Sequence, residues 1–100
     1  MMNLDDVIPI QDFSNETLLG LAQRLEESET FEHLILREME LDEIWRRVDT
    51  VMTREQNSGV DVVGLERVRK LVFEAHDLAA DGNPREAANR LRQAMTLQEV

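Results

Sequence analysis

The chain contains no cysteine, only four aromatic residues, and four glycines that stand apart from one another. Without cysteine it has no disulfide, no thiolate ligand for a metal and no thiol nucleophile. Isolated glycines make no glycine-rich phosphate-binding loop. Because aromatic side chains are scarce, we expect Leu, Val, Met and Ala to fill most of the core.

Long apolar runs are also missing, since no stretch approaches the roughly 20 apolar residues that a membrane-spanning helix needs. The first residues, MMNLDDVIPI, are acidic where a signal peptide is basic, and their apolar run is too short for its hydrophobic region. We therefore expect a cytoplasmic protein. Its 100 residues, 42% hydrophobic and 32% charged, are typical of one globular domain with a single core.

Positive charge is nearly absent from the first half of the chain. Residues 1–44 hold twelve Asp and Glu but only two Arg, whereas residues 45–100 hold nine charges of each sign. The first half therefore carries the whole net charge of −10, which repels nucleic acid and anionic membranes and attracts cationic surfaces. We expect a protein partner with a basic surface, and no nucleic-acid or membrane partner. The alternative is a solvated surface that only keeps the protein in solution. The acidic face predicted to meet the partner consists of Glu26, Glu27, Glu29, Glu32, Glu40 and Glu43.

Apolar periodicity predicts an extended lead-in over residues 1–13 and a single helical domain over residues 14–100. Pro9 keeps the residue before it extended. Ser14 is a predicted N-cap, and Phe13 before it is placed to contact the first helix. Thr30 is predicted to cap a second helix, and one long bent helix through residues 28–30 is the alternative. The helices are expected at about 15–27, 31–55, 61–81 and 84–97.

The second predicted helix is roughly 37 Å long at 1.5 Å per residue and outlasts its neighbours. Its expected core face consists of Phe31, Leu34, Ile35, Leu41, Ile44, Trp45, Val48, Val51 and Met52. Near its start the apolar arc is too wide for one neighbouring helix to cover. We therefore expect a homodimer, or in a monomer a partner groove, at Leu34, Ile35, Leu36 and Met39.

The last two predicted helices are joined by a short turn. Ser58 and Asp61 resemble a capping box for the third helix, which ends where Gly82 allows a left-handed turn. Asn83 then caps the fourth helix, with Pro84 in its first position. So short a connection folds the two helices back on each other. The sequence thus predicts an all-α fold, a small four-helix up-down arrangement that ends in an antiparallel αα-hairpin.

Residues 68–100 resemble a single tetratricopeptide-type helical hairpin. The residues that carry the resemblance are the small Ala75, Ala87 and Ala94, Gly82 at the turn, and the large Leu71, Leu78 and Leu91. The chain departs from the family where Leu71 replaces an aromatic residue and Glu99 replaces a proline. No second copy stands about 34 residues away, the period of that repeat. The resemblance implies a scaffold that binds peptides or proteins.

No residue pattern for catalysis or cofactor binding is present. Each Glu-x-x-His pair of a di-iron bundle needs Glu three residues before His, but His33 has Thr30 there and His76 has Phe73. Calcium loops and nucleophile elbows are also lacking. We predict no catalytic, metal or cofactor site. The sequence favours a protein–protein interaction or adaptor module without catalytic activity. The alternative is an acidic, polyanion-mimicking regulator or inhibitor of a basic nucleic-acid-binding protein, whose binding would depend more steeply on salt.

Overall fold

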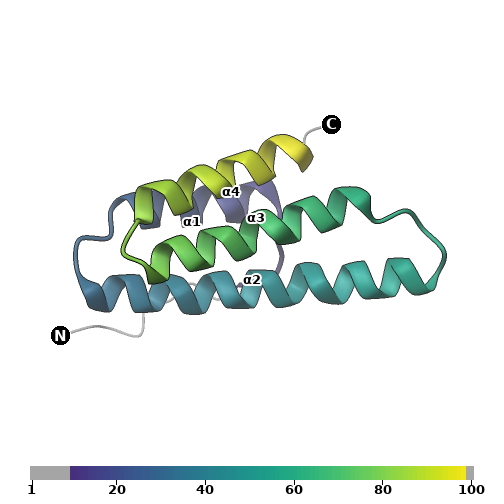
Figure 1. The fold of residues 1–100 in the computed structure, drawn as a ribbon, viewed down its shortest axis with the longest axis horizontal. Coiled ribbons are helices and arrows are strands. Elements are labelled where there is room, and N and C mark those ends of the chain that lie inside the picture. The colour runs from purple at the N-terminus through teal and green to yellow at the C-terminus, as the bar shows by residue number, and fades with distance from the viewer. Residues whose placement is uncertain (1–9, 99–100) are drawn as a thin grey trace.

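The computed structural model, which describes residues 10–98, consists of four α-helices joined by short connections (Figure 1). They are α1 (Asn15–Glu26), α2 (Phe31–Asn57), α3 (Val63–Ala80) and α4 (Pro84–Gln98). The described part of the chain contains no strand. The predicted all-α, four-helix arrangement is confirmed, including the antiparallel hairpin formed by α3 and α4.

Local capping separates the first two helices. The hydroxyl of Ser14 accepts a hydrogen bond from the Thr17 N–H at 3.3 Å. The hydroxyl of Thr30 accepts one from the His33 N–H at 3.2 Å. Each cap satisfies a backbone donor that the first turn of a helix leaves free. The chain therefore turns between Glu26 and Phe31 and does not continue as one bent helix.

The capping box predicted for the third helix is wrong. The Ser58 hydroxyl donates back to the Arg54 carbonyl at 3.2 Å, so this residue ends α2. Gly59 follows with φ +80°, a left-handed conformation that glycine adopts without steric cost. The third helix begins only at Val63, whose N–H donates to Asp61 Oδ1 at 3.0 Å. Ser58 is thus used by the preceding helix.

The core lies where all four helices meet. Its largest fully buried apolar side chains are Leu18, Leu21, Leu25, Leu41, Ile44, Val48, Val72 and Leu91. Small side chains fill the crossing of α3 with α4, where Ala75, Ala87 and Ala94 are fully buried. Gly82, at φ +85°, makes the turn between these two helices. Alanines at a crossing let two helix backbones approach closely, which ties the hairpin geometry to these small residues.

Contacts around the bundle are uneven. The third helix packs against both α2 and α4, the fourth also packs against α1, and α1 and α2 meet only sparsely. The segment before α1 helps to fill that gap, since Ile10 is buried and Phe13 packs against the core. The carbonyls of Gln11 and Phe13 accept hydrogen bonds from Arg47 Nη1 and Gln98 Nε2, at 3.0 and 3.1 Å. Residues 1–9 of the predicted lead-in lie outside the described residues.

The longest helix extends past its neighbours. The C-terminal part of α2 and the start of α3 project together beyond α1 and α4 at one end of the molecule (Figure 1). The turns between α1 and α2 and between α3 and α4 lie at the opposite end. The molecule is therefore elongated, with extents of 47, 23 and 22 Å. Within residues 10–98, no helix combines the length and the apolar character that crossing a bilayer requires.

Candidate interaction surface

A buried ion pair lies in the seam between α1 and α2. Arg37 and Glu40 are both buried, form an ion pair one turn apart on α2, and are approached by Arg24 of α1, whose Nε lies 3.9 Å from Glu40 Oε2. Glu40 is only 2% exposed, so its predicted place on the acidic face is wrong. Its side chain lies in the seam between α1 and α2. There Arg24 of α1 and Arg37 of α2 compensate the negative charge, whose burial would otherwise be costly.

The other five residues of the predicted acidic face are accessible but differ in their partners. Glu26 bonds Arg92 of α4 at 2.5 Å, and Glu43 contacts Arg47 one turn along α2 at 3.4 Å. The Arg92 guanidinium lowers the pKa of the Glu26 carboxyl below its ordinary value. The remaining acids here, with half-exposed Glu38, make no ion pair among the described residues. We call this set the acidic cluster: Glu27, Glu29, Glu32 and Glu38.

The predicted dimer or groove residues divide between core and surface. Leu36 is buried and Leu34 is half-buried, so the part of the prediction that places Leu36 on an exposed patch is wrong. Ile35 and Met39 are exposed, at 40% and 58%. Phe31, predicted for the core face, is 74% exposed because no other helix covers the first turn of α2 on that side. These residues recur every four positions, and we call Phe31, Ile35 and Met39 the α2 stripe.

The acidic cluster and the α2 stripe share one helix face. At 100° per residue, Glu38 and Glu32 stand on either side of the stripe along the first two turns of α2. Glu27 and Glu29 lie just before this helix, in the turn that leads to it. An uncovered apolar stripe is thus bordered by carboxylates that have no cation of their own within residues 10–98.

A small cavity opens beside the same helix, between α2 and α3. Asp42 and Trp45 of α2 line it with Phe73 and His76 of α3, and its volume is about 170 Å³. We call it the Trp45 pocket. Trp45 also packs against the core, whereas Phe73 is 53% exposed. From sequence, Trp45 is expected in the core and Phe73 has no predicted role, because the pocket depends on the register between α2 and α3.

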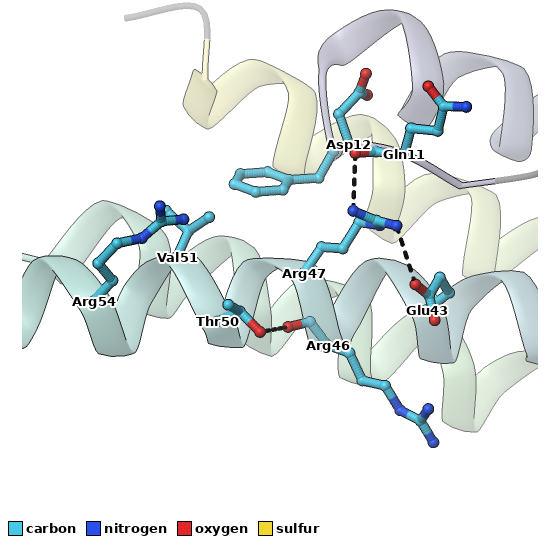
Figure 2. Close-up of a pocket in the computed structure, with 9 residues that line it drawn as sticks. Gln11, Asp12, Glu43, Arg46, Arg47, Thr50, Val51 and Arg54 are labelled. Atoms are coloured by element: carbon cyan, nitrogen blue, oxygen red, sulfur yellow. Dashed lines mark hydrogen bonds and ion pairs between the residues drawn. The ribbon is translucent and has the colours of Figure 1, made fainter.

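A larger groove of about 470 Å³ lies between α2 and the segment before α1. In Figure 2, Arg47 points from α2 toward the Gln11 carbonyl and Glu43, while Arg46 points away from the groove. The Thr50 hydroxyl donates to the Arg46 carbonyl at 2.8 Å. The groove thus brings no nucleophile together with a general base, and several of its polar groups hold the N-terminal segment against α2.

Metal-binding geometry is not found in the described chain, where no three or more Asp, Glu or His side chains gather as ligands. The two histidines lie apart: His76 lines the Trp45 pocket, and His33 lines a polar pocket of about 140 Å³ beside Arg24 and Arg37.

Comparisons of the chain with protein-family models, with curated proteins and with solved structures find no match. The resemblance of residues 68–100 to a tetratricopeptide hairpin therefore stays a prediction.

Proposed function

We propose that this protein is a protein–protein interaction module, without catalytic activity of its own, that binds its partner through the first turns of α2. The observation that carries the proposal is the α2 stripe, an apolar row that stays exposed on α2 among the helices of residues 10–98. Exposed apolar rows with a polar rim are typical of binding surfaces. Phe and Met, two of the three residues, are also enriched in interfaces.

The chemistry of the rim favours a basic, amphipathic segment as the partner. An apolar row at i, i+4 and i+8 matches the apolar face of a partner helix. Glu32 and Glu38 would then meet Lys or Arg on the flanks of that helix. Such rim pairs contribute specificity and a faster encounter more than they contribute affinity.

A different molecule fits this surface better than a second copy of the chain. A twofold contact along the start of α2 would bring Glu32 and Glu38 close to their own copies and add repulsion at the interface. We therefore expect sedimentation to show a monomer at micromolar concentration. A stable dimer that the substitution Met39→Glu dissociates would assign the stripe to the homodimer predicted from the sequence.

The test of the proposal compares two surfaces of similar exposure. The variant Ile35→Glu/Met39→Glu places two charges in the stripe, and the variant Val60→Glu/Val63→Glu does the same at the opposite end of the molecule. Partners captured by the native protein are identified, and their dissociation constants are measured with each variant. We expect the dissociation constant to rise at least tenfold for the stripe variant and to change less than twofold for the control. A tenfold change in affinity corresponds to 1.4 kcal/mol. Equal binding by both variants would contradict the proposal.

The second candidate function is a polyanion-mimicking regulator of a basic protein. It is favoured by the acidic cluster, whose carboxylates have no ion-pair partner in residues 10–98. Salt dependence separates the two functions. A mimic loses affinity steeply between low and high salt, whereas binding anchored by the apolar stripe weakens much less.

A further inference from the structure

The indole of Trp45 belongs to a row of side chains in the contact between α2 and α3. Arg69 of α3 lies over this ring, with its guanidinium carbon 5.8 Å from the ring centroid. The same guanidinium bonds Asp49 Oδ1 of α2 at 2.5 Å. The protein thus holds one of its own cations between an aromatic face and a carboxylate, an arrangement in which cation–π attraction and a charge-assisted hydrogen bond act together.

The Trp45 pocket also offers aromatic rings and a carboxylate, further along the contact between α2 and α3. Asp42 precedes Asp49 by seven residues, or two helical turns, so both carboxylates point from one side of α2. Phe73 follows Arg69 by one turn of α3 and adds a second aromatic ring to the pocket wall. Two aromatic rings, a carboxylate and the imidazole of His76 therefore line an open cavity of about 170 Å³, which is of side-chain size.

No Lys or Arg side chain lines this pocket. Arg46 contacts Asp42 Oδ2 at 2.9 Å, but its side chain is 67% exposed and is not among the residues that line the cavity. An ion pair this exposed contributes little, so it does not prevent a second cation from approaching.

We propose that the Trp45 pocket receives one Lys or Arg side chain of a protein partner, as Arg69 is received by Trp45 and Asp49. This inference rests on the proposed function and adds an anchoring site to it. An apolar side chain in the pocket would remove water from Asp42 without replacing its hydrogen bonds, which is unfavourable. A cation keeps the carboxylate paired and also contacts the aromatic rings. The net charge of −10 also attracts cations to the protein.

The test uses the fluorescence of Trp45, the only tryptophan in a chain without tyrosine. The probes are N-acetyl-arginine amide and N-acetyl-norleucine amide, titrated to tens of millimolar at equal ionic strength. We expect a saturable change with the arginine amide and none with the norleucine amide. Asp42→Asn should weaken arginine-amide binding about fivefold or more, the loss of one charge-assisted contact. Glu55→Gln, which removes a charge from α2 outside both the pocket lining and the acidic cluster, should change the affinity for the arginine amide less than twofold.

Three results would overturn the inference: no saturable change with the arginine amide, equal binding of the norleucine amide, or equal effects of Asp42→Asn and Glu55→Gln. Thermal melting of each variant verifies that it is folded, and Phe73→Leu gives an independent variant of the opposite wall. The variant Ile35→Glu/Met39→Glu leaves the pocket lining intact, so it should bind the arginine amide normally while losing the partner. Arginine-amide binding tests the pocket and partner binding tests the α2 stripe, so the two proposals can fail independently.

Discussion

At the scale of single residues, Glu40 is the carboxylate on which the seam between α1 and α2 depends. It is the only buried acid in the described chain, and Arg37 and Arg24 both contact it. Glu40→Ala would leave these arginines without their buried counter-charge, which typically costs about 3–5 kcal/mol. Urea denaturation measures the loss. The control is Glu38→Ala, half-exposed on the same helix, which should change stability by less than about 0.5 kcal/mol. Similar losses in the free energy of unfolding for both variants would mean that water reaches the seam between α1 and α2.

A second residue-scale prediction concerns pH and the contact between α1 and α4. Hydrogen bonding to Arg92 lowers the pKa of Glu26 from its ordinary 4.5. A carboxyl whose pKa is depressed by folding adds stability above its ordinary pKa, and this contribution is lost as pH falls through the lowered value. Glu26→Gln should therefore lower the melting temperature at neutral pH, and the difference from the native protein should shrink in strong acid.

The matched control for this pair is Glu27→Gln, which removes the neighbouring exposed carboxylate. Glu27 makes no ion pair within residues 10–98, so its removal should leave the melting temperature nearly unchanged or slightly raised at neutral pH. A Glu26→Gln effect that persists undiminished in strong acid would show that the side chain acts by packing and not by charge.

At the scale of elements, the α3–α4 hairpin depends on its small residues. Ala87→Leu and Ala94→Leu insert three carbons each at positions with no exposed surface. Overpacking of this kind costs roughly 1–3 kcal/mol per site, because the helices must separate or adopt strained rotamers. Ala80→Leu, at an exposed position near the end of α3, adds the same volume in solvent. Urea denaturation should separate the core variants from this control. Equal stability of all three would mean that the crossing is loosely packed.

The helices themselves could be predicted because their signals are local. The caps at Ser14 and Thr30 and the turn at Gly82 depend on residues within a few positions in sequence. Misassigned residues depend on other elements. The burial of Glu40 follows from Arg24 on α1, and the exposure of Phe31 follows from the absence of any helix over the first turn of α2.

The candidate site was predictable only in part, for the same reason. From sequence, the wide apolar arc of Leu34, Ile35, Leu36 and Met39 predicts that one neighbour cannot cover the start of α2, and of these residues Ile35 and Met39 are exposed. The Trp45 pocket needs the register that sets Phe73 of α3 beside Trp45 of α2. Periodicity within one helix carries no information on that register, since it depends on how the two helices slide along each other.

At the scale of the whole molecule, charge is distributed along the long axis. The turn that carries Glu27 and Glu29 lies at one end, and the projecting C-terminal part of α2 lies at the other (Figure 1). Residues 45–100, which include that projection, carry no net charge. The field is therefore strongest at the end that also carries the α2 stripe. A cationic partner would be oriented toward this surface before contact.

Concentrating like charges at one end of the molecule adds repulsion between them, which we expect to lower the stability of the fold. Replacing Glu27 and Glu38 of the acidic cluster by Gln removes repulsion, including that between Glu38 and Asp42 at i, i+4, where a like-charge pair costs about 0.2–0.5 kcal/mol. Glu32 is kept, because its charge in the first turn of α2 favours the helix. We expect the variant to resist urea better than the native protein at low salt. The advantage should fade as the Debye length falls from about 10 Å at 0.1 M salt to about 3 Å at 1 M. The same variant should associate more slowly with the partner. Greater stability with an unchanged association rate would mean that the carboxylates form only a solvated surface, whereas slower association would show that the protein gives up stability to attract its partner.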